Sequence, residues 1–110
     1  MRVSEKSELL VMSIALKTHV DVLYRLLPIL DVYETRKEVN SIMEVFLKSI
    51  QEYNSLKKDR ISLIMASVAL VSLDNVLFQS YDNKLIAKKC YESVALKLNE
   101  VKTLLQLILA

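Results

Sequence analysis

Glycine is absent from this chain of 110 residues, and proline occurs once, as Pro28. Many tight turns need a positive φ angle that glycine adopts most readily, so folds rich in β-hairpins are disfavoured. The absence of glycine also excludes the phosphate-binding loop and the dinucleotide-binding fingerprint, because both motifs require glycine at fixed positions. The composition therefore predicts an all-α protein without a nucleotide site of either kind.

Cysteine and histidine occur once each, as Cys90 and His19. A single cysteine excludes an internal disulfide, and a single histidine excludes a paired-histidine zinc site within one chain. From helical spacing, we expect His19 to be a half-buried structural residue and Cys90 to lie beside the core as a small apolar side chain. We accordingly expect no enzyme: no catalytic residue, no metal and no cofactor.

An excess of one charge is also missing. The 15 lysines and arginines against 13 aspartates and glutamates give a net charge of +2. So weak a field does not imply nucleic acid or an anionic membrane as a partner, and any basic surface must be local. The longest uncharged run, residues 61–73, is shorter than the ~20 residues of a membrane span. We expect a buried helix there, in a cytoplasmic protein without a membrane span.

Apolar residues, by contrast, are plentiful. They make up 53% of the chain, and the mean hydropathy is +0.29. The length fits one domain, residues 1–110, with one hydrophobic core. A monomer of this size rarely hides so much apolar surface, because exposed apolar patches are usually small. We therefore expect a homo-oligomer or a larger complex with other proteins.

The chain also repeats itself. Residues 13–25 (SIALKTHVDVLYR) align without a gap with residues 67–79 (SVALVSLDNVLFQ). The identities are Ser, Ala, Leu, Val and Leu, and the same offset pairs Glu5 with Asp59. Helical periodicity alone makes apolar positions coincide, so chance similarity of two leucine-rich helices is the competing explanation. The matched polar positions favour duplication.

The duplicated unit is interpreted as a helical hairpin. Repeat 1 spans about residues 3–56 and repeat 2 about residues 57–110. Self-similarity over half of a chain indicates tandem copies of one supersecondary unit. The second helix of each unit retains only the apolar pattern, and its alignment needs one extra residue.

Helix start and stop signals predict two helices in the first half. The first helix spans about residues 5–26, because Pro28 disfavours helical geometry at the residue before it. The second begins after Asp31 as its N-cap, with Glu34 placed to complete a capping box. It should end near Asn54.

The second half should hold two more helices. The third has Asp59 as its N-cap and runs to about Tyr81, and the fourth follows Asp82 or Asn83 and continues almost to Ala110. Short connections make consecutive helices antiparallel neighbours. The predicted fold is an antiparallel four-helix bundle built from two tandem hairpins related by a pseudo-twofold axis. An open pair of hairpins completed by a second protomer is equally compatible.

The third and fourth helices indicate how the core is specified. The third is apolar nearly all round and should be the most buried, with small residues that allow close approach of another helix. The fourth carries a core seam with alternating steps of four and three residues: Ala87, Tyr91, Val94, Leu98, Val101, Leu105 and Ile108.

A second apolar line is expected on the far side of the fourth helix. Leu85, Leu96 and Leu107 recur every eleven residues, and a lone bundle need not cover them. Together with Leu10 and Ile14 of the first helix and the outer apolar residues of the third helix, they are the predicted partner interface. The alternative is an irregular bundle that buries these residues within one chain.

Basic residues suggest a different function. They gather at the second connection and at the start of the fourth helix, where they would contact phosphates without reading bases: Lys57, Lys58, Arg60, Lys84, Lys88 and Lys89. No aromatic residues alternate with them, and a solvated helix face explains them equally well. The main hypothesis is a non-catalytic assembly, scaffold or adaptor protein that acts through protein–protein interaction. The alternatives are a small helical subunit of a nucleoprotein complex and a bundle that binds a small ligand in a cavity.

Overall fold

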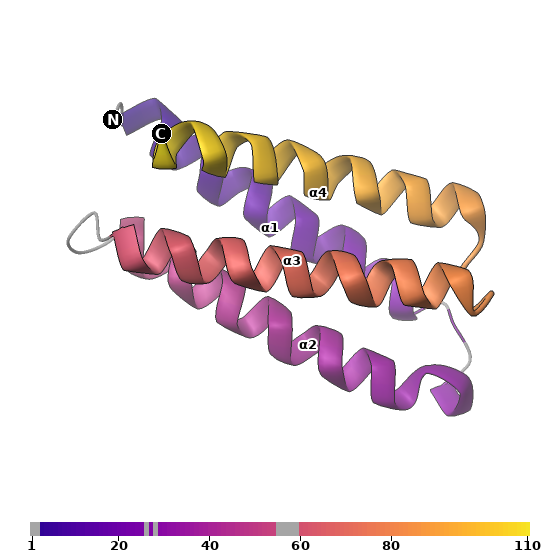
Figure 1. Ribbon diagram of the computed structural model, residues 1–110. Helices are drawn as coiled ribbons and strands as arrows, with labels where there is room; N and C mark the ends of the chain where they lie inside the picture. Colours follow the sequence, from indigo (N-terminus) through magenta and orange to yellow (C-terminus); the bar gives the residue numbers. More distant parts are fainter. Residues whose placement is uncertain (1–2, 26, 28, 55–59) are drawn as a thin grey trace.

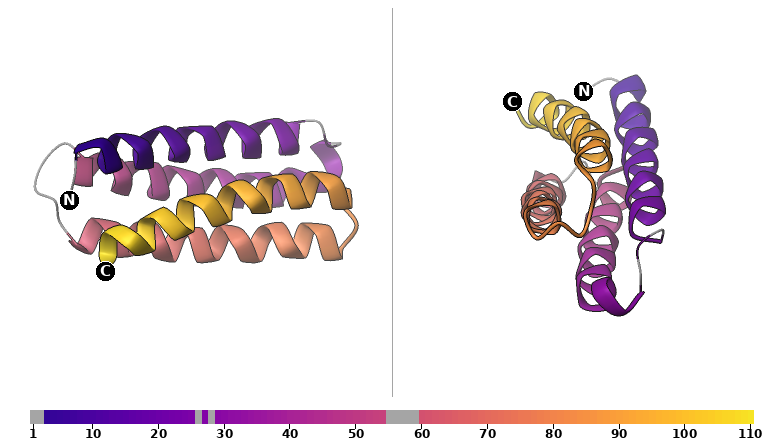
Figure 2. Two further views of the ribbon diagram at one scale, coloured as in Figure 1. Left: turned by 90° about the horizontal axis from the view of Figure 1, so that it is seen from above. Right: turned by 90° about the vertical axis from the view of Figure 1, so that its right-hand side faces the viewer.

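The computed structural model describes residues 3–25, 27, 29–54 and 60–110. All regular structure in this part of the chain is helical (Figure 1). The four helices are α1 (Val3–Arg25), α2 (Ile29–Glu52), α3 (Arg60–Asp82) and α4 (Lys88–Leu109). Consecutive helices run in opposite directions (Figure 2). The prediction of an all-α helical bundle is confirmed.

The helices form a closed ring. Each helix packs against the next one in the chain, and α4 packs against α1. The most extensive packing joins α2 and α3, which belong to different predicted hairpins. Among the described residues, the diagonal helices make no close backbone approach to one another. One core therefore runs along the axis of a molecule with extents of 42 × 22 × 18 Å.

Small side chains explain the close packing of α3. Ser62, Ala66 and Ala69 of α3 are buried. Small residues let a neighbouring backbone approach, as the sequence predicted. Buried serines satisfy their hydroxyls within their own helices: Ser13 donates to the Leu9 carbonyl at 2.7 Å, and Ser49 donates to the Val45 carbonyl at 2.8 Å. These hydroxyl groups are therefore buried without an unsatisfied hydrogen-bond donor.

The core seam of α4 is confirmed over most of its length. Val94, Leu98, Val101 and Leu105 are buried, while Tyr91 and Ile108 are half-buried against the core. Ala87 is exposed and precedes the helix, so its predicted place in the seam was wrong. The alternating step of four and three residues thus selects the buried face of this helix.

The predicted start of α2 needs correction, while that of α3 agrees with the structure. α2 begins at Ile29, so Asp31 lies in its first turn and is not the N-cap. The residue before α2 in the sequence is Pro28, and proline suits a helix start because the first N–H groups have no intrahelical acceptor. α3 begins at Arg60, in agreement with the prediction, although Asp59 lies outside the described residues.

The start of α4 differs more, because α3 ends in a closed turn. The Lys84 N–H donates to the Tyr81 carbonyl at 3.0 Å, and the Leu85 N–H donates to the Ser80 carbonyl at 2.9 Å. This bond pair is the Schellman motif, with Lys84 at φ 62° in the position where glycine is usual. Ile86 then enters the core, so α4 begins only at Lys88, well after the predicted Asp82 or Asn83.

Candidate interaction surface

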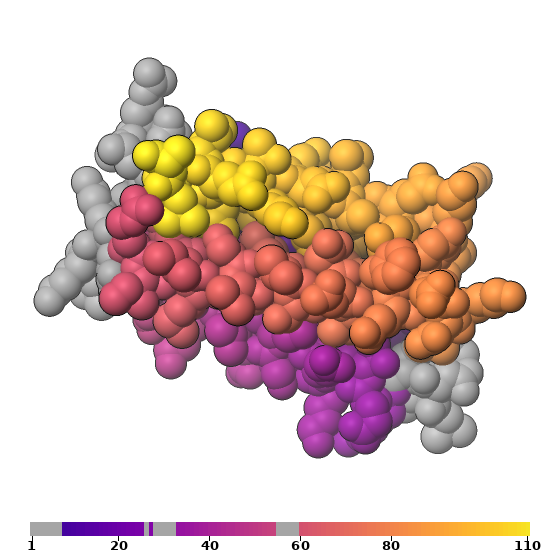
Figure 3. All heavy atoms as spheres, in the orientation of Figure 1, coloured from indigo at the N-terminus to yellow at the C-terminus, as the bar shows by residue number. Residues whose placement is uncertain are grey.

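The largest exposed apolar surface lies on the outer face of α3. Its members are 48–64% exposed, and they are Ile61, Ile64, Met65, Val68, Val71 and Phe78. In Figure 3, α3 crosses the front of the molecule between α4 and α2. Among the residues whose burial the structure describes, α3 has nine buried residues, more than any other helix, as the sequence predicted. A bundle covers a helix on one side only, and the opposite apolar side chains of α3 face solvent.

The exposed face continues onto α2. Val45 of α2 is 48% exposed and lines a groove between α2 and α3, together with Ile64, Met65 and Val68. The groove has a volume of about 410 Å³ and also contains Ile42. The described grooves of the molecule have similar volumes, between about 390 and 460 Å³. Their volumes do not single out a ligand cavity.

An aromatic cluster borders the face on the other side. The Tyr81 and Tyr91 rings stack with centroids 4.7 Å apart, and Phe78 meets Tyr91 edge-to-face at 6.4 Å. Burial raises the pKa of the Tyr91 phenol, with smaller contributions from Asp74 and Tyr81. The cluster fixes the position of Phe78, because stacked and edge-to-face pairs stabilise ring orientation.

The interface residues predicted by name lie elsewhere and divide into two groups. Leu96 and Leu107 of α4 are 61% and 69% exposed, and Ile14 of α1 is 49% exposed. Leu10 is half-buried against the core. Leu85 is half-buried and lies in the connection before α4, so it does not belong to a line along that helix. The predicted interface is therefore not one continuous surface of a single helix.

Leu96 and Leu107 border a second groove, between α1 and α4. Met12 and Leu104 also line it, but so do charged and polar residues: Glu8, Asn99, Glu100 and Thr103. This mixed lining makes the α1/α4 side a weaker apolar surface than the outer face of α3.

The predicted basic residues are not brought together. Lys57 and Lys58 lie outside the described residues. Arg60 is exposed at the start of α3, where one guanidinium nitrogen donates to the Leu109 carbonyl at 3.0 Å. Lys84, Lys88 and Lys89 are exposed at the other end of α3 (Figure 1). Among these three lysines, Lys88 forms a long ion pair with Glu92, at 3.9 Å.

His19 and Cys90 line one shallow groove between α1 and α4. Both are exposed, so the predictions of a half-buried histidine and a core cysteine were wrong. The Nδ1 atom of His19 lies 2.8 Å from the Ala15 carbonyl, which can only accept, so Nδ1 carries the hydrogen. Among the described residues, no group of three or more possible metal ligands lies together.

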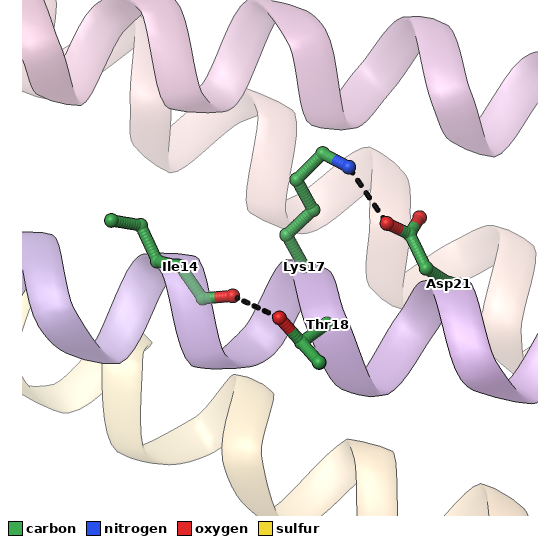
Figure 4. A network of polar contacts seen from close by, with 4 residues as sticks. All are labelled: Ile14, Lys17, Thr18 and Asp21. Atoms are coloured by element: carbon green, nitrogen blue, oxygen red, sulfur yellow. Dashed lines mark hydrogen bonds and ion pairs between the residues drawn. The ribbon is translucent and has the colours of Figure 1, made fainter.

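Polar contacts on α1 are local. Lys17 pairs with Asp21 at 2.7 Å, and the Thr18 hydroxyl donates to the Ile14 carbonyl at 3.1 Å (Figure 4). Both contacts join residues one helical turn apart, and such pairs stabilise a helix modestly. They explain the polar side of α1 without a ligand.

The α3 helix has one further property. Of the helices that the structure describes, it is the one long and apolar enough to cross a membrane by length and composition. The mean hydropathy of its most apolar window is 2.0, and 44% of that window is buried inside the molecule. Core helices of soluble proteins have the same length and composition.

The chain has no significant match among protein-family models, curated proteins or solved structures. The case for the candidate interaction surface therefore depends only on the residues that form it. The sequence analysis named no individual residue of the outer face of α3 as part of the interface, although residues 61–73 carry no charge on any side. A helix in a four-helix bundle can bury only part of its circumference, so an apolar residue on every side already implies an exposed apolar face.

Proposed function

We propose that this protein is a non-catalytic helical assembly protein that acts inside the cell through protein–protein interaction. The observation that carries the proposal is the outer face of α3, where six large apolar side chains are each about half exposed. Soluble proteins rarely expose contiguous apolar patches of this kind, and such patches are typical of interaction sites. A partner that covers α3 removes this surface from water.

The chemistry of other surfaces supports the same proposal. His19 and Cys90, the chain's single histidine and single cysteine, line one shallow groove, and no group of three or more possible metal ligands lies together among the described residues. The predicted basic contact residues that the structure describes lie at opposite ends of α3. A nucleic-acid backbone would have to span that distance to contact both groups, so phosphate binding is the weaker proposal.

We also propose that the bundle arose by tandem duplication of one helical hairpin. Three aligned leucine pairs support this: Leu9 and Leu63, Leu16 and Leu70, and Leu23 and Leu77 are all buried. Other aligned pairs have diverged in their surroundings. Tyr24 is 1% exposed while its counterpart Phe78 is 53% exposed. In this proposal the shared leucines retain the ancestral core, and the surfaces have specialised.

Site-specific photo-cross-linking in cells tests the assembly function. A photoreactive amino acid replaces Val68 on the outer face of α3, and the control places it at Lys48, an exposed residue of α2. Covalent protein adducts of defined mass should form from position 68 and not from position 48. Adducts from neither position, or adducts with RNA or DNA alone, would contradict the proposed function.

A salt titration of the purified protein separates the two main candidates. Association through apolar surface is maintained or strengthened by kosmotropic salt. Binding to phosphates weakens steeply as salt rises, because counterions compete with the lysines and arginines. Light scattering with and without single-stranded and duplex nucleic acid should show a mass that is independent of nucleic acid and stable in salt.

A further inference from the structure

The exposed residues of α3 follow a regular spacing. Going along the helix, steps of three and four residues alternate through Ile61, Ile64, Val68, Val71, Asn75, Phe78 and Asp82. Every one of these positions is exposed. Alternating steps of three and four are the spacing of the a and d positions in a coiled coil, which contact a facing helix. The outer face of α3 is therefore patterned for packing against another helix.

The inner face of α3 has the same pattern and is already packed. It is formed by Ser62, Ala66, Ala69, Leu73, Val76 and Ser80, which are all buried. The inner seam thus packs in the core of the bundle. The outer seam, on the opposite side of α3, is exposed along its length. A helix whose outer side faces only solvent would carry apolar residues on its inner seam alone, because solvent-facing positions are normally polar.

The outer faces of α2 and α4 lack such a seam. α2 exposes charged residues that include Lys37, Glu44 and Lys48. On α4, exposed Glu92 and Glu100 flank Leu96. α1 exposes three large apolar side chains, Val11, Ile14 and Val22, against six on the outer face of α3.

Charges at the two ends of the seam indicate the orientation of a partner. Arg60 is the first residue of α3 and Asp82 is the last, and both are exposed. Each has the wrong sign for the dipole of its own helix, which is positive at the start and negative at the end. A helix that runs antiparallel along the seam brings its own Asp82 to within about one helical turn of Arg60, and its own Arg60 to within about one turn of Asp82. A parallel copy would place like charges together instead.

We propose that the outer seam of α3 pairs with the same seam of a second copy, in antiparallel orientation about a twofold axis between Val68 and Val71. This inference rests on the proposed assembly function and names its partner. The twofold places Val68 against Val71 of the second copy, and Ile61 against Phe78 of the second copy. Such an isologous contact closes on itself and gives a dimer.

The dimensions of the seam suit this contact. From Ile61 to Phe78 it is about 25 Å long at a rise of 1.5 Å per residue, along a molecule 42 Å in length. A standard interface takes about 800 Å² from each partner, and the chain has a surface of 7024 Å². Val45 of α2 and the groove that it lines with Ile64, Met65 and Val68 extend this apolar surface beside the seam.

Disulfide cross-linking tests the orientation. In a Cys90→Ser background, which removes the single native thiol, Ile61→Cys and Phe78→Cys are made as separate proteins of different tagged mass. The antiparallel pair predicts a cross-link only when the two proteins are mixed. A Lys48→Cys protein on the outer face of α2 measures random collision. Cross-linking of Ile61→Cys with itself would overturn the antiparallel arrangement.

Light scattering tests the interface. The wild type should have twice the 12.6 kDa mass of one chain. The double variant Val68→Glu, Val71→Glu places like charges beside the axis and should raise the dissociation constant about 100-fold or more. Its matched control is Val11→Glu, Val22→Glu, at valines of similar exposure on α1, which should stay dimeric. Circular dichroism confirms that both variants are folded.

The remaining outcomes are decisive as well. A wild type that stays monomeric at millimolar concentration would overturn the dimer. A monomer that binds neutral phospholipid vesicles, and loses them with Val68→Glu, Val71→Glu, would assign the seam to a membrane and also overturn it. A monomer that cross-links in cells from position 68 to a different protein would overturn self-pairing and leave the assembly function standing.

Discussion

The Tyr24 hydroxyl lies 2.9 Å from the Ser80 hydroxyl, so a hydrogen bond joins α1 to α3 across the buried core. Ser80 donates its own hydrogen to the Val76 carbonyl at 2.9 Å, so Tyr24 is the donor to Ser80. Both side chains are buried, at 1% and 2% exposure. The bond connects helices that are diagonal in the ring and therefore fixes their relative position.

Removal of this hydrogen bond should destabilise the bundle by different amounts, depending on which of the two side chains is replaced. Tyr24→Phe leaves Ser80 bonded to its own helix and should cost about 1 kcal/mol of unfolding free energy. Ser80→Ala leaves a buried phenol without an acceptor and should cost about 2 kcal/mol. Urea unfolding of both variants and of the double variant measures the coupling. A coupling near zero would show that the two hydroxyls do not stabilise each other.

Alkaline pH should weaken the fold through Tyr24. Burial raises the pKa of this phenol above its ordinary value of 10.0, and nearby Glu38 raises it further. Between the unfolded and folded pKa values the folded chain binds more protons, so unfolding free energy falls as pH rises. The stability that the neutral Tyr24 phenol contributes is fully present below pH 10. It is lost as the pH rises through the pKa that the phenol has in the folded state.

Unfolding measured from pH 8 upward checks this expectation. Tyr24→Phe should show a smaller decline at alkaline pH than the wild type, whereas Tyr33→Phe, at an exposed tyrosine, should decline like the wild type. Equal alkaline declines in all three proteins would assign the effect to other groups.

Lys84 is a position where glycine should stabilise the protein. Its φ of 62° places a side chain in the left-handed region, which costs a residue with a Cβ atom about 1 kcal/mol. Lys84→Gly should raise the free energy of unfolding by up to about 1 kcal/mol, since the Schellman bonds of the turn are retained. Lys84→Ala keeps the Cβ atom and should give no comparable gain. Thermal and urea unfolding distinguish the two variants.

The aligned leucines of the two halves should contribute similarly. Leu16 and Leu70 are 0% and 1% exposed in the same core. Leu16→Ala and Leu70→Ala should each cost about 3 kcal/mol, the sum of lost transfer free energy and a cavity. Val11→Ala, at a 65% exposed residue, should change stability by less than about 0.5 kcal/mol. A large difference between the two leucine variants would argue against equivalent roles in a duplicated core.

The Cys90 thiol should react freely in the folded protein. It is exposed at the start of α4, so a disulfide reagent that releases a coloured thiolate should modify it at a rate close to that of the urea-unfolded chain. Strong protection in dilute solution would place Cys90 in a covered site. Modification should leave the helical circular dichroism unchanged, because this side chain is outside the core.

The sequence by itself determined the class of fold and much of the core. The absence of glycine excluded its usual turn motifs, and the seam of α4 predicted that Val94, Leu98, Val101 and Leu105 are buried. These inferences succeeded because helical periodicity is a local property of the chain. The start of α4 was less predictable, since the turn at Lys84 uses a residue that sequence rules do not assign to a positive φ.

The tertiary structure alone decided which apolar faces stay outside. Leu10 and Ile14 are both apolar residues of α1, yet one packs against the core and the other is exposed. Ile64 and Leu63 differ in the same way on α3. A helix with apolar residues on every side does not specify its own orientation, so the neighbours that pack against it determine which residues are buried. That choice left the outer seam of α3 exposed.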